Sequence, residues 1–462
     1  MVDLETDYLV IGAGASGLSF VDALITADPE VEVVVVDRRH GAGGHWVDAY
    51  PFVRLHQPSA YYGVNSVPLG EDRIDTDGIN AGFYERASAA ELVRYYERVM
   101  EHLAATGRVR FLLGHEYQGS EHGRHIVRST ISGSPTTLAP RRRFVDAAYV
   151  ESVIPSRHTP TFGIDDGVRF VTPNDLPALD EPAGGLVILG GGKTAMDVCV
   201  WLLEHGVDPD QIQWVRPRDG WFVDRTYTQP HDLVANMLDM QSRSVEAAAL
   251  ATSGSDFARR LEAHGMMFRL DPDCEPEIYR GATLARAERD ALQTIERVVR
   301  LGRVRSISAN EIDFDGGTMP IGGDTVVVDC TAQGLATSAT KPIFDGGQMT
   351  VQFTTLGVAP WSAAILGFVE SLDVDDAERN RLCPAVPRTG LIADQLLVYH
   401  VGFQAEGARR DHPDIGAWAA TSRLNPMRSL AAHASDDVVQ PMFMRMFEHY
   451  EQAMANLARH AH

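Results

Sequence analysis

Two glycine-rich segments most strongly constrain the fold of this chain, because each stands between a short apolar run and a helical pattern. The first glycine turn, residues 12–17, follows the apolar residues 8–11, and the second glycine turn, residues 190–195, follows residues 186–189. Glycines between a strand and a helix permit a tight turn, close approach of a pyrophosphate to the backbone and close packing of the helix. The chain therefore predicts an α/β fold with two Rossmann-like dinucleotide-binding units.

The strands that follow the two turns end in residues of opposite charge. Asp37 lies 25 residues after Gly12, whereas Arg216 lies 26 residues after Gly190. An acid at this position accepts hydrogen bonds from ribose hydroxyls, and a base suits a 2′-phosphate. We therefore expect FAD in the first site and NADPH in the second, although the second unit could also have lost its nucleotide. The predicted cofactor-binding residues of the two units are Gly12, Gly14, Gly17, Asp37, Arg38, Gly190, Gly192, Lys193, Thr194, Arg216 and Arg218.

The composition argues against several other classes of function. The chain has 462 residues and a net charge of −22, which disfavours binding to nucleic acids and to anionic membrane surfaces. No apolar run reaches the roughly 18 residues that span a bilayer. The first predicted strand leaves no room for a signal peptide, so we expect a cytoplasmic protein. The four cysteines form no close pair and the 17 histidines show no ligand spacing, so neither a redox-active dithiol nor a metal site is predicted.

The pattern along the chain predicts a discontinuous FAD domain with an NADPH domain inserted into it. We place the first FAD segment at residues 1–155, the NADPH domain at 156–324 and the second FAD segment at 325–462. The apolar run at 325–334 is interpreted as the strand that crosses back into the FAD domain. A helical insertion at about 232–300 could be a lid, a wall of the substrate pocket, a dimer face or a stabilising addition, so a homodimer stays open.

Two helices can be predicted together with their starting points. Ser88 and Glu91 have the spacing of a capping box, so we expect a helix from Ser88 to about Leu103. A short strand at 108–113 should follow it. A second helix is expected at the C-terminal end, from residue 437 to 459.

Three further motifs resemble those of flavin-containing monooxygenases. Gly43-Gly44-His45-Trp46 is similar to the GGxW motif that follows the first acidic strand in flavin-containing and Baeyer–Villiger monooxygenases. Residues 216–225 resemble the stretch with basic residues, glycine and tryptophan that follows their second glycine turn, and residues 326–334 occupy the place of their ATG-type turn. The resemblance covers roughly the whole chain. It adds to the expected cofactor-binding residues Gly44, His45, Trp46, Thr331 and Ala332.

The resemblance implies an FAD- and NADPH-dependent oxygenase acting on a small organic substrate. In such enzymes NADPH passes a hydride to FAD, and the reduced flavin activates O₂ as a C4a-(hydro)peroxyflavin. The segment after the GGxW motif should pass over the flavin and supply hydrogen-bond donors to it. The catalytic candidates are His56, Gln57, Ser59 and Asn65, with Tyr61 and Tyr62 as further donors or as packing residues.

Several departures from the family pattern place the chain in an outlying branch. The FxGxxxHxxxW/P signatures are absent between the two glycine turns. Gln57 lies where flavin-containing monooxygenases carry an asparagine, and Gln333 replaces the glycine of the ATG-type turn. A flavin-dependent reductase, oxidase or dehydrogenase without productive oxygen transfer therefore stays as an alternative, as does a non-catalytic FAD-binding protein.

Overall fold

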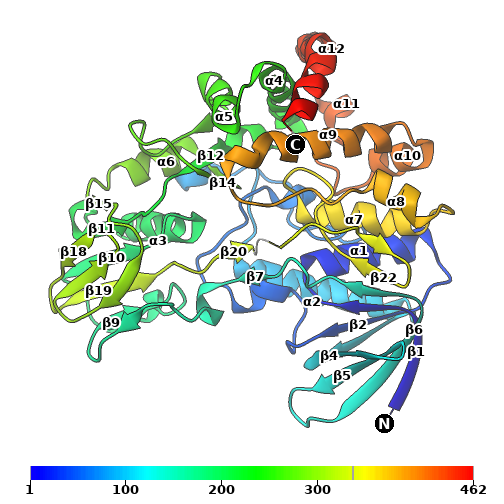
Figure 1. Cartoon of the computed structure of the whole chain (residues 1–462), viewed down its shortest axis with the longest axis horizontal. Helices are drawn as coiled ribbons and strands as arrows, with labels where there is room; N and C mark the ends of the chain where they lie inside the picture. Colours follow the sequence, from blue (N-terminus) through cyan, green and yellow to red (C-terminus); the bar gives the residue numbers. More distant parts are fainter. Residues whose placement is uncertain (1, 336–337, 461–462) are drawn as a thin grey trace.

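The computed structural model describes residues 2–335 and 338–460 of the chain. Two sheets lie apart in the molecule, and a layer of helices runs along one side of it (Figure 1). The N-terminal strand belongs to one sheet, while the C-terminal helix lies in the helical layer.

The first sheet is built around the N-terminal strand. Its strand order is β21 (Phe344–Asp345), β22 (Gln348–Thr350), β6 (Pro135–Asp146), β1 (Val2–Ile11), β2 (Val33–Asp37) and β3 (Val109–Leu113). The pairs from β22 to β3 are parallel, as the βαβ connections require. An antiparallel extension of β6 is formed by β4 (His115–Glu121) and β5 (Arg124–Ser129). Residues 2–146 and residues 344–350 thus contribute strands to one sheet.

Helices cover this sheet, and their starts follow the local sequence. Helix α2 (Ala89–Ala105) begins at the predicted capping box, where the Ser88 backbone N–H donates to the Glu91 carboxylate at 2.7 Å. Helix α1 (Ala15–Ala27) packs against α7 (Ala359–Glu370). Gly367 makes this contact close, because a Cβ there would lie 2.4 Å from the Phe20 carbonyl oxygen.

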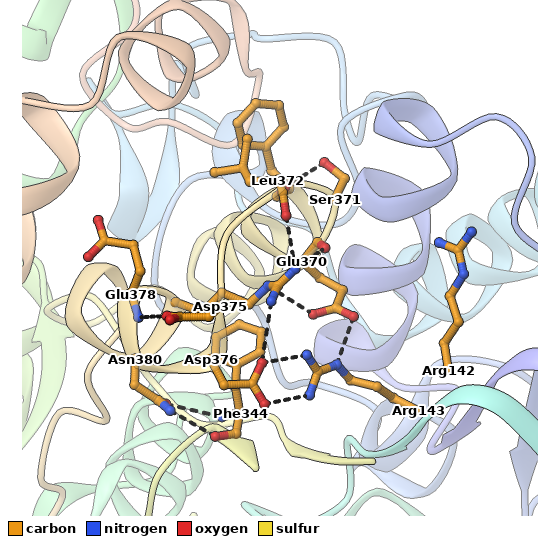
Figure 2. A network of polar contacts seen from close by, with 12 residues as sticks. Arg142, Arg143, Phe344, Glu370, Ser371, Leu372, Asp375, Asp376, Glu378 and Asn380 are labelled. Carbon is orange, nitrogen blue, oxygen red and sulfur yellow. Dashed lines mark hydrogen bonds and ion pairs between the residues drawn. The ribbon is translucent and has the colours of Figure 1, made fainter. Parts of the chain in front are cut away.

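An ionic network anchors the C-terminal segment to the first sheet (Figure 2). Arg143 of β6 donates to Glu370 of α7 at 2.8 Å and pairs with Asp376 at the start of α8 (Asp376–Leu382) at 2.5 Å. The Tyr8 hydroxyl of β1 donates to the same Glu370 at 2.9 Å. Burial and the nearby Glu370 charge raise the pKa of Tyr8, so it stays a neutral donor.

The second sheet is parallel throughout and packs around the second glycine turn. Its order is β15 (Val298–Val299), β11 (Ile212–Val215), β10 (Gly185–Leu189), β19 (Thr325–Asp329) and β9 (Arg169–Val171). Helix α3 (Lys193–Glu204) follows β10. Beside this sheet lies a smaller one of β18 (Gly317–Pro320), β17 (Glu311–Phe314), β16 (Val304–Ile307) and β8 (Gly163–Ile164).

The predicted boundary at residue 325 is wrong, because β19 belongs to the second sheet. It pairs with β10 in parallel from Gly185↔Thr325 to Leu189↔Asp329 and is buried on both faces. A strand buried in a parallel sheet and a strand that crosses between two domains have the same apolar pattern. The sequence of residues 325–334 therefore could not show to which sheet β19 belongs. The chain crosses between the sheets only after β19, where β20 (Gly334–Leu335) pairs antiparallel with β7 (Ser152–Val153).

The predicted helical insertion at 232–300 contains strands as well as helices. Helices α4 (Val234–Leu250) and α5 (Gly254–Ala263) are followed by β13 (Met267–Phe268) and β14 (Ile278–Leu284). These two strands flank β12 (Gly220–Asp224), which precedes α4, in a small sheet. Helix α6 (Arg286–Gln293) comes next. Strand β14 pairs in parallel with β12, which is distant in sequence. The local pattern of residues 278–284 could not reveal this partner.

The helical layer combines this region with the end of the chain. Helix α12 (Asp436–Arg459) begins one residue before the predicted start and packs against α4. The remaining helices of this layer are α9 (Gln395–Arg410), α10 (Pro413–Thr421) and α11 (Leu430–His433). None of the helices in the described part of the chain combines the length and apolar character needed to cross a bilayer.

Candidate active site

The first glycine turn has the geometry that a bound pyrophosphate requires. Gly12 adopts φ +111°, and a Cβ at Gly17 would lie 1.9 Å from the Gly12 carbonyl oxygen. Gly14 precedes α1 as its N-cap and offers no side-chain cap. The first N–H groups of α1 are therefore left to bind an anion, which the helix dipole also favours.

Asp37 lies at the end of β2 beside this turn and is buried. Its carboxylate accepts hydrogen bonds from the backbone N–H groups of Ala13 and Arg39, both at 2.8 Å. These bonds fix the carboxylate, and each oxygen keeps a lone pair for a ribose hydroxyl. Arg38 pairs with Glu151 on the surface. A cavity of about 310 Å³ adjoins the end of β2, with Arg38 and Glu116 in its wall.

The GGHW segment packs directly against the first glycine turn. The Gly43 N–H donates to the Ala13 carbonyl at 2.8 Å, and a Cβ at Gly44 would lie only 2.9 Å from the Gly14 Cα. Only glycines allow this approach, since Gly43 and Gly44 also have positive φ angles of +120° and +61°. The sequence motif is thus explained by contact between two backbone turns.

The aromatic residues of this segment are held in the core. The Trp46 indole N–H donates to the Tyr62 hydroxyl at 2.9 Å, and the two rings meet edge to face. His45 lies against Trp46 with ring centroids 4.7 Å apart. Burial and the nearby Arg39 charge lower the pKa of His45 to about 4, so its imidazole is neutral.

The structure divides the four catalytic candidates into two groups. Ser59 and Asn65 are engaged with the protein: Ser59 Oγ accepts from the Ala87 N–H at 2.9 Å, and Asn65 Oδ1 accepts from the Ser422 hydroxyl at 2.7 Å. Gln57 is half-buried, and its amide forms no side-chain hydrogen bond within the described residues. Its donors are therefore available to a ligand.

The imidazole of His56 likewise makes no hydrogen bond to the residues that the structure describes, and several charged groups lie near it. Its carbonyl accepts from the Thr283 hydroxyl at 2.6 Å, which ties the segment to β14. Burial and then the Lys193 charge lower the pKa of the imidazole to about 4. His56 is therefore a neutral group at physiological pH. The hydroxyl of Tyr61, in the same segment, donates to the Thr228 carbonyl at 2.6 Å.

The second glycine turn repeats the geometry of the first. Gly190 has φ +127°, and a Cβ there would lie 2.6 Å from the Cys330 carbonyl oxygen. Gly192 is the N-cap of α3 and provides no side-chain cap, so the start of this helix can also bind an anion. Thr194 lies in the first turn of α3, beside the Tyr50 hydroxyl.

The two predicted arginines of the second unit have different surroundings. Arg216 is buried, stacks on Trp214 with its guanidinium carbon 4.7 Å from the ring centroid, and pairs with Asp219 at 3.0 Å. Asp219 also accepts from Arg300 at 2.9 Å. Arg218 is exposed, and its carbonyl lies next to the backbone of the second glycine turn. Binding of a 2′-phosphate by Arg216 stays a prediction, and Arg218 offers the more accessible guanidinium.

The turn after β19 is held by local hydrogen bonds. The Thr331 hydroxyl donates to Asp329 at 2.6 Å and lies 3.1 Å from Nε2 of His158. Ala332 follows it in the same half-buried turn. Both residues thus lie where the chain leaves the second sheet, at the carboxyl end of a central strand, where open α/β sheets bind ligands.

Lys193 points into a buried charge cluster formed by Arg86, Lys193, Asp197, Arg225 and Glu288. Lys193 pairs with Asp197 and lies 3.9 Å from Glu288. Arg225, which is 0% exposed, pairs with Glu288 at 2.6 Å, and Arg86 approaches Glu288 to 3.6 Å. Lys193 is therefore engaged by protein carboxylates, and its predicted contact with a phosphate would require it to leave them.

The buried charge cluster was not predicted from the sequence, although its residues come from segments throughout the predicted site. Burial opposes ionisation of Glu288, but the attraction of Lys193, Arg225 and Arg86 prevails and lowers its pKa to about 2. The Tyr50 hydroxyl donates to Asp197 at 2.8 Å. Arg225 is the last residue of the stretch 216–225 that resembles the family. Its place in that stretch was the one sign of the charge cluster in the sequence.

The described residues contain no group of three histidine, cysteine or acidic side chains placed to hold a metal ion. All four cysteines are free thiols. Burial raises the pKa of Cys199 and of Cys330, so both are unreactive thiols in the core.

Comparisons with known proteins give one close relative group and several distant ones. The uncharacterized protein Rv2000 of Mycobacterium tuberculosis is 40% identical over 429 residues, which are 92% of this chain and 79% of that protein. The probable FAD-binding monooxygenase AlmA of an Acinetobacter species is 27% identical over 212 residues, which are 44% of this chain and 40% of AlmA. No protein-family model matches the chain.

Solved structures of flavin monooxygenases share the fold. The cyclohexanone monooxygenase of Rhodococcus sp. Phi1, crystallised with NADP⁺, superposes with a TM-score of 0.50 at 15% identity. The match covers 91% of each chain. At this identity the likeness establishes the mixed α/β architecture with its parallel sheets.

Proposed function

The chain belongs to the family of the mycobacterial protein Rv2000, a distant branch of the flavin-monooxygenase-like proteins, and from this premise we propose that it is an FAD- and NADPH-dependent monooxygenase of a small organic substrate. The observation that carries the proposal is the duplicated glycine turn. In the first copy the next strand ends in Asp37, and in the second copy Arg216 and Arg218 follow the next strand. This pattern suits one coenzyme with a free ribose and one with a 2′-phosphate.

FAD would bind along the first glycine turn. The N–H groups at the start of α1 would receive the pyrophosphate, and Asp37 would accept from the ribose. The contact between Gly14 and Gly44 supports this placement, because it brings the GGHW segment to the same edge of the sheet. The FAD domain would then comprise about residues 1–155 together with the segment after β19.

NADPH would bind at the second glycine turn, in an inserted domain that runs from about residue 156 to the end of β19. The N–H groups at the start of α3 and the Thr194 hydroxyl would contact its pyrophosphate. Arg218 would approach the 2′-phosphate, with Arg216 stacked behind it on Trp214.

Gln57 and His56 would control the chemistry at the flavin edge. Bound FAD supplies the hydride acceptor and the centre at which O₂ is activated. The free amide of Gln57 can donate a hydrogen bond to a group that gains negative charge during the reaction. His56 is neutral, so it can donate or accept one hydrogen bond without adding charge. The packed rings of Trp46 and Tyr62 would help to exclude water.

One observation favours a second function, a flavin-dependent reductase, oxidase or dehydrogenase. Gln57 stands where flavin-containing monooxygenases carry an asparagine, so oxygen control would depend on a residue that departs from the family pattern. If Gln57 does not stabilise the oxygen adduct, NADPH oxidation would yield hydrogen peroxide instead of product.

The absorption spectrum of the purified protein tests the proposal. We expect a yellow protein whose flavin bands bleach when NADPH is added without oxygen and return on aeration. Oxygenated product formed in step with NADPH consumption in the presence of a substrate would support a monooxygenase. Reduction with hydrogen peroxide as the main oxygen product across a substrate panel would favour the second function, and bound FAD that NADPH does not reduce would contradict both.

A further inference from the structure

The segment that carries His56 and Gln57 is held in place by its backbone. The two side chains form no hydrogen bond to the residues that the structure describes, so their position depends on the main chain. On one side of them Leu55, and on the other Ser59, donates a backbone hydrogen bond to residues 85–87, at 2.9 and 3.0 Å. A neighbouring stretch of chain thus fixes the ends of the segment, and its middle requires a separate anchor.

The His56 carbonyl oxygen is the point at which a different part of the molecule anchors the segment. The Thr283 hydroxyl of β14 donates to this oxygen at 2.6 Å, and Arg225 Nε donates to it at 3.4 Å. The Arg225 guanidinium also donates to the Thr283 carbonyl at 3.4 Å, so the three residues form a closed set of contacts. Thr283 and Arg225 are both buried, and a hydrogen bond in such surroundings is stronger than one in water.

Arg225 is itself fixed, so the segment is held against a rigid support. Its guanidinium donates to Asn80 Oδ1 at 3.3 Å and pairs with Glu288 at 2.6 Å. The same Asn80 oxygen accepts from Arg86 Nε at 3.1 Å, and the Arg86 guanidinium also donates to the Leu55 carbonyl at 3.1 Å. The buried charge cluster therefore connects β14 and α6 with the backbone of the segment.

We propose that Thr283 is a positioning residue, which through the His56 carbonyl sets where the His56 and Gln57 side chains lie at the flavin edge. The inference rests on the proposed function, in which these two side chains control the reaction of the flavin with oxygen. It also gives the region of residues 232–300 a role, because β14 lies within that region and supports the segment. Thr283 acts through His56 and does not contact the reacting atoms.

Thr283→Val tests the inference, because valine keeps the branched shape of threonine and lacks the hydroxyl. The variant should keep FAD and anaerobic reduction by NADPH, whereas the rate at which O₂ reoxidises the flavin should change roughly 2- to 10-fold, the range expected for one neutral hydrogen bond. Thr283→Ser retains a hydroxyl and should restore the rate. Thr294→Val is the matched control, because the Thr294 hydroxyl donates to a carbonyl at 2.7 Å on the exposed surface. In the His56→Ala/Gln57→Ala double variant, Thr283→Val should add less than about a 2-fold change, since its effect passes through those residues.

Hydrogen exchange of the backbone amides in residues 54–60 measures the same contact without flavin chemistry. Exchange there should be roughly 2- to 10-fold faster in Thr283→Val than in the unmodified protein, while α2 keeps its rate and Thr294→Val changes neither. Unchanged exchange or unchanged reoxidation in Thr283→Val, effects that Thr294→Val reproduces, or an effect on reoxidation that persists in full in the double variant would each overturn the inference. Failure of NADPH to reduce the flavin of the unmodified protein would instead refute the proposed function, and the exchange measurement would still show whether Thr283 holds the segment.

Discussion

Replacing Glu288 by glutamine should destabilise the protein strongly at neutral pH. Glu288 is 3% exposed and is the carboxylate shared by Arg225, Arg86 and Lys193. The gap between its ordinary pKa of 4.5 and its value of about 2 in the folded protein corresponds to roughly 3 kcal/mol of stability at pH 7. Losses of this size are typical when one partner of a buried ion pair is removed, because the remaining charges stay buried without compensation.

The depressed pKa of Glu288 also sets the direction in which the unfolding free energy changes with pH. The folded-state pKa of Glu288 is depressed, so its contribution is complete above about pH 4.5 and is lost as the pH falls towards 2. The difference in unfolding free energy between the unmodified protein and Glu288→Gln should therefore shrink from about 3 kcal/mol at pH 7 to about 2 kcal/mol near pH 3.5.

Urea unfolding followed by tryptophan fluorescence measures this difference at each pH. Asp290→Asn is the matched control, because Asp290 lies on the same helix with its side chain 61% exposed and should change stability little. A difference below about 1 kcal/mol at pH 7, or one that grows on acidification, would refute the assignment of Glu288 as the anionic centre of the cluster.

The remaining predictions concern the two turns and the flavin edge. Gly14→Val should yield flavin-poor protein, because a larger side chain meets the neighbouring glycine turn; a normal ratio of flavin to protein absorbance would place FAD elsewhere. Gly190→Ala should keep FAD but slow anaerobic reduction by NADPH, since its Cβ would lie 2.6 Å from a backbone oxygen at φ +127°. His56→Ala and Gln57→Ala should each retain FAD and anaerobic reduction while diverting electrons to hydrogen peroxide; unchanged coupling in both would assign oxygen control to other residues. The rate of flavin reoxidation should show no inflection near pH 6.5 from His56, whose pKa is about 4, and an inflection that His56→Gln abolishes would contradict this.

The sequence predicted best those features that are encoded within one short segment. Both glycine turns form as expected, and α2 begins at its capping box, because the deciding contacts join residues a few positions apart. The sheet to which β19 belongs and the strand β14 depend on partners distant in the chain, so the local pattern could not assign them. The buried charge cluster was missed for the same reason, since Arg86, Arg225 and Glu288 meet only after the units have packed together.

The basic residues near the second glycine turn differ in whether a carboxylate of the protein already pairs with them. At a net charge of −22 the whole protein repels a phosphorylated coenzyme at long range. At physiological ionic strength that field decays over about 8 Å, so the local charge at the site decides binding. Lys193 and Arg216 pair with buried carboxylates, whereas Arg218 is exposed and forms no ion pair with the residues that the structure describes. We therefore expect the exposed Arg218, whose backbone adjoins the second glycine turn, to be the cation that meets a coenzyme phosphate against the field of the rest of the molecule.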